Sequence, residues 1–116
     1  MGKKTFIAYV LFISMMLVES EVHAITCNEA ITFLLPCEPF MLGLGPRIPS
    51  LSCCTSIAII FKQTKTPELR RSTCSCLKNA AFQAGIKHER ATLLSRLCRT
   101  RFSFPIDPLV DCSSVS

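Results

Sequence analysis

Cys53-Cys54 and Cys74-Ser75-Cys76 are two close cysteine pairs in the middle of a 116-residue sequence, and their geometry decides how the chain is held together. Consecutive residues on a helix point about 100° apart, and residues two apart point about 200° apart. Neither arrangement brings the two sulfur atoms of one pair within bonding distance. We therefore expect each close pair to bridge to two different segments of the chain.

Four more cysteines flank these pairs and complete the pattern C-x9-C-x15-CC-x19-C-x-C-x21-C-x13-C, with Cys27, Cys37, Cys98 and Cys112 as the outer members. Eight cysteines allow about 105 pairings, so the spacing alone leaves the connectivity open. Small secreted domains often rely on such bridges because their hydrophobic cores are too small to stabilise them. The sequence therefore predicts one small domain with four disulfides.

Residues 1–24 have the features of a secretory signal peptide. Lys3-Lys4 precedes an apolar run from Phe6 to Val18, and Val22-His23-Ala24 offers small residues for cleavage. This run is shorter than the roughly 20 residues that span a bilayer. A secreted domain of residues 25–116 is predicted, and its net charge stays at +5 because two lysines and two glutamates leave with the signal.

Hydrophobic periodicity predicts four helices around the cysteines. The first runs from Cys27 to the helix-breaking Pro36, and residues 36–49, with four prolines and two glycines, are predicted to form a loop. The second begins at a cap on Ser50 or Ser52. Its predicted inner face comprises Leu51, Cys54, Ile57, Ala58 and Phe61.

The third helix is predicted to start at Thr66-Pro67-Glu68, which combines a cap, a first-turn proline and an acid, and to end at Gly85. The fourth is predicted from about Glu89 to Cys98. The prolines of residues 102–110 then predict an irregular C-terminal arm. The predicted inner faces comprise Leu69, Cys76, Leu77, Ala80, Ala81 and Ala84 in the third helix and Leu93, Leu94 and Leu97 in the fourth.

The composition of residues 25–116 disfavours an enzyme, a metal site and a nucleic-acid-binding protein. His88 is the one histidine in this part, and its charged neighbours favour a solvated helix start over a zinc or catalytic site. The carboxylates are scattered, and neither a Gly-rich phosphate loop nor an aromatic and basic stacking platform occurs. No catalytic residue and no cofactor are predicted.

The cysteine pattern of residues 25–116 resembles the eight-cysteine motif of plant non-specific lipid transfer proteins. The interval lengths and the polar Ser75 resemble the type 1 branch of that family. The resemblance implies an all-α fold, a four-helix bundle stapled by disulfides, with an irregular C-terminal arm around an apolar tunnel. It also implies four bridges, which join Cys27 to Cys76, Cys37 to Cys53, Cys54 to Cys98 and Cys74 to Cys112.

The function that the resemblance implies is a secreted, non-enzymatic carrier of acyl lipids such as fatty acids and phospholipids. A monomer is expected that touches membrane surfaces transiently, carries lipid between membranes or to extracellular surfaces, and does not bind nucleic acid. Arg70 matches the family's arginine that contacts the polar end of the lipid, although the acid before it is Leu69 here and the tyrosine of the arm is Phe104. By face and by family position, the predicted tunnel lining comprises Phe33, Ile57, Leu77, Ala81, Leu94, Phe102, Phe104 and Ile106.

Two other functions fit the same cysteine framework. Protease and α-amylase inhibitors of the same broad superfamily share the CC and C-x-C pairs, and an inhibitor would use residues 38–49 as its exposed rigid loop. A membrane-active defence protein would draw on the net charge of +5. Binding of a fluorescent fatty acid and inhibition of digestive hydrolases are the measurements that separate these alternatives.

Overall fold

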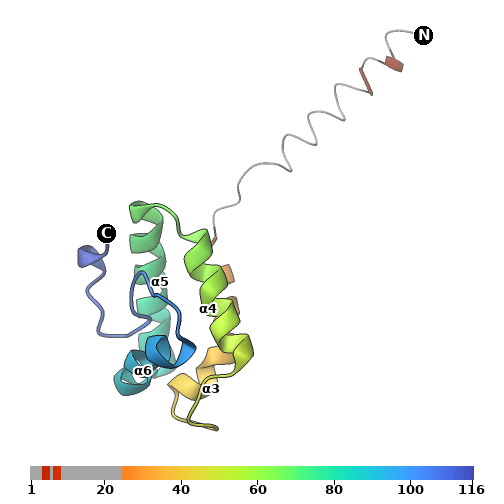
Figure 1. The fold of residues 1–116 in the computed structure, drawn as a ribbon. Coiled ribbons are helices and arrows are strands. Elements are labelled where there is room, and N and C mark those ends of the chain that lie inside the picture. Colours follow the sequence, from red (N-terminus) through yellow and green to blue (C-terminus); the bar gives the residue numbers. More distant parts are fainter. Residues whose placement is uncertain (1–3, 6, 9–24) are drawn as a thin grey trace.

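The computed structural model describes residues 4–5, 7–8 and 25–116, so most of the predicted signal segment 1–24 lies outside the described residues. The all-α prediction is confirmed, and no strand occurs among the described residues. Figure 1 shows the helices with the C-terminal arm laid across them. In chain order the elements are α2 (Cys27–Phe33), the 3-10 helix η1 (Leu35–Cys37), α3 (Glu38–Met41), α4 (Leu51–Gln63), α5 (Pro67–Ala84), α6 (His88–Cys98) and the 3-10 helix η2 (Cys112–Ser114).

Local capping groups set the ends of the two longest helices. The Ser50 side chain accepts a hydrogen bond from the Cys53 backbone N–H at 3.0 Å at the start of α4. The Thr66 side chain accepts one from Leu69 N–H at 3.1 Å at the start of α5. Gly85 ends α5 with a φ of 74°, a left-handed conformation that glycine adopts without steric cost. The predicted starts of these helices and the end of α5 are confirmed.

The predicted loop of residues 36–49 is wrong over its first part. Residues 35–41 form η1 and α3, and Phe40 and Met41 are buried in the core. Pro36 and Pro39 each lie in the first turn of a helix, where a missing N–H costs nothing and the fixed φ is already helical. The prolines therefore divide one helical path into short pieces instead of ending it.

The predicted inner face of α4 is also wrong in part. Cys53, Ile57 and Ile60 are the buried residues of this helix, while Leu51 and Ala58 are exposed. The two stripes differ by a rotation of about one residue, so both satisfy a helical period. The stripe that contains Cys53 faces inward, where its sulfur is bonded to η1.

The inner faces of α5 and α6 are predicted correctly at their centres and wrongly at their edges. Leu77 and Ala81 are buried on α5, and Leu94 is buried on α6. The predicted inward residues that the structure leaves exposed are Ala84, Leu93 and Leu97. Ala91 is buried on α6 although the prediction omits it.

Four disulfides join the helices, and no described cysteine is free. Each close pair reaches two different elements, which confirms the expectation from helix geometry. The structure has the pairing that the resemblance implies. The bonds are Cys27–Cys76 between α2 and α5, Cys37–Cys53 between η1 and α4, Cys54–Cys98 between α4 and α6, and Cys74–Cys112 between α5 and η2.

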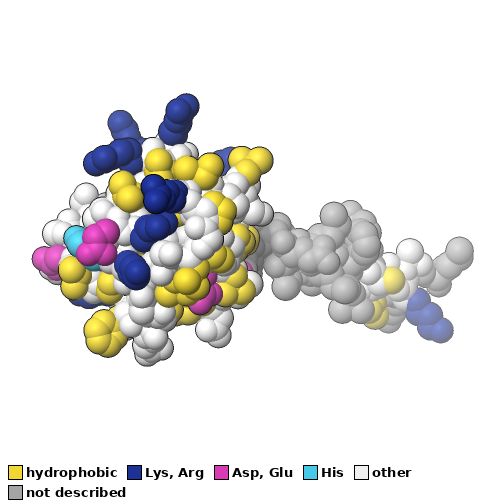
Figure 2. All heavy atoms as spheres, turned by 90° about the horizontal axis from the view of Figure 1, so that it is seen from below, with side chains coloured by type: hydrophobic (Ala, Val, Ile, Leu, Met, Phe, Trp, Pro, Cys, Tyr) yellow, Lys and Arg dark blue, Asp and Glu magenta, His cyan; other side chains and the backbone are white. Residues whose placement is uncertain are grey.

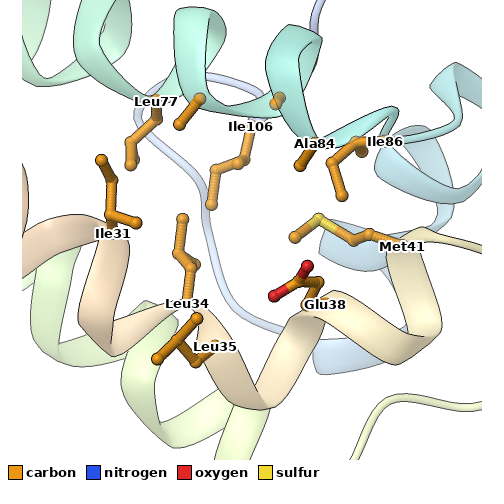
Figure 3. Close-up of a pocket in the computed structure, with 11 residues that line it drawn as sticks. Ile31, Leu34, Leu35, Glu38, Met41, Leu77, Ala84, Ile86 and Ile106 are labelled. Atoms are coloured by element: carbon orange, nitrogen blue, oxygen red, sulfur yellow. The ribbon is translucent and has the colours of Figure 1, made fainter.

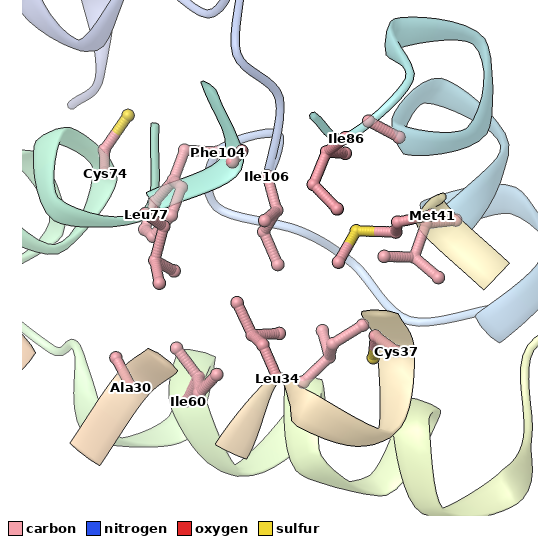
Figure 4. Packing of buried hydrophobic residues seen from close by; sticks show 14 of the residues in the cluster. Ala30, Leu34, Cys37, Met41, Ile60, Cys74, Leu77, Ile86, Phe104 and Ile106 are labelled. Atoms are coloured by element: carbon pink, nitrogen blue, oxygen red, sulfur yellow. The ribbon is translucent and has the colours of Figure 1, made fainter. Parts of the chain in front are cut away.

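The C-terminal arm is irregular, as predicted, until η2. Phe104 and Ile106 are buried in the core that Figure 4 shows in close-up. Asp107 is buried too, with one carboxylate oxygen 2.6 Å from Nδ1 of His88 and the other accepting from Leu109 N–H at 3.0 Å. His88 begins α6 with a side chain that is 48% exposed, which confirms the predicted solvated helix start, and its ring also fastens the arm to the helix.

Candidate functional site

A pocket of about 220 Å³ lies between two walls of the helical domain. One wall is built by α2, η1 and α3, and the other by α5 and Ile86 just beyond it, with Ile106 of the arm between them (Figure 3). Every lining side chain except one is apolar. The lining residues are Ile31, Leu34, Leu35, Glu38, Met41, Leu77, Ala80, Ala81, Ala84, Ile86 and Ile106.

The pocket has a buried end and an open side. Met41, Leu77 and Ile106 are almost fully buried and form an apolar floor. Leu35 is 54% exposed and Glu38 is half-buried, so the wall formed by η1 and α3 reaches the surface. A hydrocarbon chain can therefore enter from the surface and leave water as it moves inward.

Small side chains on α5 create this space. Ala80, Ala81 and Ala84 follow one another on the face of α5 that meets the other wall, and an alanine fills much less volume than the leucine or isoleucine opposite it. The Cys27–Cys76 disulfide ties α2 to α5, with a Cα–Cα distance of 5.7 Å. The helices of the two walls are thus held together covalently.

The arrangement suits binding of an apolar chain. Removing apolar surface from water is favourable by about 0.8 kcal/mol per methylene. The pocket volume of about 220 Å³ is below the roughly 300–1,000 Å³ of typical ligand pockets. A long acyl chain would therefore have to widen the pocket.

Three of the predicted tunnel residues line the pocket: Leu77, Ala81 and Ile106. Phe33 instead borders a broader and more open depression of about 420 Å³ on α2, η1 and α4. The other lining residues of this depression are Asn28, Glu29, Thr32, Pro36 and Ser56. Four of the eight predicted lining residues are therefore divided between the pocket and this depression.

The remaining predicted tunnel residues belong to a closed part of the core. Ile57, Leu94 and Phe104 are at most 2% exposed and do not line the pocket. Phe61 packs between two aromatic rings of the arm, at 4.9 Å from Phe102 and 5.0 Å from Phe104. Contact of these residues with a ligand stays a prediction.

Arg70 does not line the pocket, and its guanidinium is occupied by backbone carbonyl groups. Its Nε donates to the Ser116 carbonyl at 2.8 Å, and its Nη1 donates to those of Lys65 at 3.0 Å and Thr64 at 3.3 Å. Arg71 similarly donates from Nε to the Val115 carbonyl at 2.8 Å. The arginines fasten the end of the chain to α5, and a head-group role for Arg70 stays a prediction.

Sequence reasoning missed one whole wall of the pocket. Ile31, Leu34, Glu38 and Met41 recur at helical spacing straight through both prolines, and this continued period is the signal that could have revealed the wall. The prediction stopped the period at Pro36. The missed lining residues are Ile31, Leu34, Leu35, Glu38, Met41, Ala80, Ala84 and Ile86.

Two other kinds of site are not seen in the part of the chain that the structure describes. No group of three or more histidine, cysteine or acidic side chains there could hold a metal ion. None of the helices described there is long and apolar enough to cross a membrane.

Comparison with known proteins points to one family. Residues 7–106 match a family model described as "Probable lipid transfer". A non-specific lipid-transfer protein of Pinus taeda is 38% identical over 93 residues, which cover 79% of this chain and 75% of the pine protein. Non-specific lipid-transfer protein 2 of Solanum lycopersicum is 34% identical over 102 residues, which cover 87% of each chain.

Solved structures of similar proteins share the fold. The hazelnut allergen Cor a 8 is 28% identical, with a TM-score of 0.69 over 79% of this chain and 99% of its own. A wheat non-specific transfer protein complexed with two molecules of phospholipid is 26% identical, with a TM-score of 0.69 over 78% of this chain and all of its own. Both likenesses cover about four fifths of this chain.

Proposed function

The chain belongs to the family of non-specific lipid-transfer proteins, and on this premise we propose that it is a secreted carrier that binds acyl lipids without chemical change. The apolar pocket between α2–α3 and α5 is the single observation that carries this proposal. The wheat relative, solved with two phospholipid molecules, supports an acyl lipid as the ligand. The predicted signal peptide supports secretion.

The energetics of such a pocket suit transfer between membranes. An acyl chain that leaves water for an apolar pocket gains about 0.8 kcal/mol per methylene. A chain that leaves a membrane gains almost nothing, because its methylenes are already out of water. Loading and unloading are therefore close to neutral and need no energy source.

The acyl chain enters over the exposed wall and extends inward past Leu77 and Ile106. Met41 on the floor is unbranched and flexible, so it can move aside as the pocket lengthens. Beyond Ile106 the chain would meet Phe104 and the closed part of the core. This path brings the predicted residues Ile57, Leu94, Phe102 and Phe104 near the ligand only after the pocket has widened.

The loop between α3 and α4 is the surface that meets the membrane in this proposal. Leu44 and Ile48 lie there 60% and 67% exposed, near the exposed Arg47, and Leu51, the first residue of α4, is 84% exposed. Figure 2 looks onto this lower end of the molecule and shows hydrophobic and basic side chains side by side. Apolar side chains enter the headgroup layer and a cation is attracted to anionic lipids, so the mixture suits an anionic membrane. The loop directly follows Met41, which places the pocket wall close to the docked lipid.

The exposed loop that an inhibitor would use is shorter in the structure than the predicted residues 38–49. Residues 38–41 form α3, and two of them are buried in the core, which leaves residues 42–50 as the exposed connection. The apolar side chains of that connection suit a lipid surface. Assays of protease and amylase inhibition remain the direct test of this alternative.

The proposed function is tested by binding and by transfer. We expect the oxidised protein to bind a fluorescent acyl probe saturably. We also expect it to move lipid from donor to acceptor vesicles. Ile48→Ser should slow transfer from anionic vesicles without changing the affinity for a soluble acyl ligand, because Ile48 lies outside the pocket.

Leu109→Ser is the matched control for Ile48→Ser. Leu109 is 69% exposed on the arm, outside the loop and the pocket, and its replacement should leave both measurements unchanged. Absence of saturable binding for acyl ligands of about 12 to 18 carbons would overturn the carrier function. Equal slowing of transfer by Ile48→Ser and Leu109→Ser would contradict the proposal that the loop docks on the membrane.

A further inference from the structure

We propose that Glu38 makes the pocket prefer lipids whose polar end donates hydrogen bonds or carries a positive charge over free fatty-acid anions. This inference rests on the proposed carrier function and names the ligand class of the same pocket.

Glu38 is the one charged side chain among the eleven that line the pocket. It is the first residue of α3, on the wall that reaches the surface, and it is half-buried. Figure 3 shows its carboxylate directed into the space between α3 and α5, near Met41. The carboxylate therefore lies beside any ligand atom that occupies the open side of the pocket.

The Glu38 carboxylate has no hydrogen-bond or ion-pair partner among the described residues. The ten other lining side chains are apolar and offer no donor. An ionised carboxylate only accepts hydrogen bonds, and it has room for about four. The Glu38 carboxylate can thus accept hydrogen bonds from water or from the polar end of a ligand.

The depth of the pocket fixes which end of a ligand meets Glu38. Leu77 and Ile106 form the apolar floor, so the hydrocarbon tail points inward and the polar end stays at the open side. A hydroxyl or an ammonium group there donates a charge-assisted hydrogen bond to the carboxylate. A fatty-acid carboxylate instead brings a like charge to a partly desolvated place, which is unfavourable.

The overall charge of the protein acts in the opposite direction. A net charge of +5 attracts anions in general, so a preference for neutral or cationic ligands would not arise from the summed field. A measured preference for neutral or cationic ligands would therefore be due to the Glu38 carboxylate and not to the net charge.

The test uses three ligands with the same sixteen-carbon chain and different ends: hexadecylamine, hexadecanol and palmitate. Their affinities are measured at neutral pH, below the concentrations at which they aggregate, by displacement of an uncharged fluorescent acyl probe. We expect hexadecylamine to bind at least about tenfold more tightly than palmitate, with hexadecanol between them. Added salt should reduce the difference, because it screens charges.

Glu38→Gln keeps the size of the side chain and removes its charge. In this variant palmitate should gain about tenfold in affinity and hexadecylamine should lose a similar factor. Glu68→Gln is the matched control, since it changes the net charge equally at an exposed position on α5 outside the pocket. The ratio of the amine and palmitate affinities should stay as in the wild type.

Three other results would contradict the proposed role of Glu38, and one of them would also contradict the carrier function. Palmitate binding as tightly as hexadecylamine to the wild type would overturn the role of Glu38 and leave the carrier function standing. Equal changes for all three ligands in Glu38→Gln would show a packing effect without selectivity. Binding of none of the ligands to any form would overturn the carrier function and this inference together.

Discussion

The two halves of the core differ in what fills them. In the closed half, Ile57, Leu94 and Phe104 from α4, α6 and the arm pack together with almost no exposed surface. In the open half, α2, η1 and α3 face the alanines of α5 across a pocket of about 220 Å³. Both halves are apolar, so the difference lies in side-chain volume and not in hydrophobicity.

A disulfide joins two helices in each half of the core. Cys54–Cys98 joins α4 to α6 in the closed half, where Ile57 of α4 and Leu94 of α6 are fully buried. Cys27–Cys76 joins α2 to α5, the two helices whose side chains line opposite walls of the pocket. A small domain can thus keep a pocket between two helices that a disulfide ties together.

Removing one disulfide at a time should give the largest effect and test this comparison directly. Cys27 and Cys76 are 49 residues apart, and Cys54 and Cys98 are 44 apart. In the chain-entropy model both double alanine variants should lose about 4 kcal/mol of unfolding free energy in urea titrations. Only loss of Cys27–Cys76 should also weaken acyl-probe binding by the folded protein, because that bond ties the pocket walls. Equal weakening in both variants would contradict the distinction.

Leu94→Ala should have the next largest effect, on stability alone. Leu94 has no exposed surface, and truncating a buried leucine costs about 2–5 kcal/mol. Urea titration should show this loss, while the affinity of the folded protein for a short acyl ligand, which fits the pocket without widening it, should stay unchanged. Leu93→Ala, at the neighbouring exposed position, is the control and should cost less than about 1 kcal/mol. A large loss of ligand affinity in Leu94→Ala would show that the closed half takes part in binding.

Ala80→Leu should have the reverse effect in the open half. The added side chain occupies the pocket without creating a cavity, so ligand affinity should fall about tenfold, which corresponds to about 1.4 kcal/mol. The unfolding free energy should change by less than about 1 kcal/mol, since alanine and leucine both favour helix. Asn79→Leu, at an exposed neighbouring position outside the pocket, should leave the affinity unchanged. Destabilisation without a loss of affinity would mean that the space is not the binding site.

Asp111→Asn should have the smallest effect, outside both halves. The Ser113 hydroxyl and backbone N–H donate to this carboxylate at 2.6 Å and 3.1 Å, and they lower its pKa below the ordinary value of 3.8. A lowered pKa in the folded state means that the stabilisation is present above the ordinary pKa and is lost as the pH falls through the folded value. Urea midpoints should therefore differ slightly at neutral pH and converge in acid, with no change in ligand binding. A difference that grows on acidification would contradict this sign.

Features that depend on a few consecutive residues could be predicted from the sequence. The Ser50 and Thr66 caps and the left-handed Gly85 are local, because each acts within one turn of its own helix. The inner faces of α4 and α6 could be predicted only in part. Two adjacent stripes can share a helical period, and the neighbouring helices decide which stripe is buried.

The pocket wall formed by α2, η1 and α3 could not be predicted from the sequence for a different reason. A proline ends a helix when it stands in the interior and begins one when it stands in the first turn, so Pro36 and Pro39 allowed either outcome. The predicted residues Leu77, Ala81 and Ile106 do line the pocket, whereas Ile57, Leu94 and Phe104 fill the closed half. Both groups are hydrophobic, and their helical members all lie on predicted inner faces, so neither property separates the two groups.

The sequence by itself determined the cysteine framework, the all-α class and the starts of the long helices, because these follow from spacing and from local hydrogen bonding. Only the tertiary structure decided which half of the core is open, that Glu38 stands in the pocket, and that Arg70 holds the end of the chain. A cavity is the volume that side chains from several distant segments fail to fill, so it exists only once those segments have been brought together.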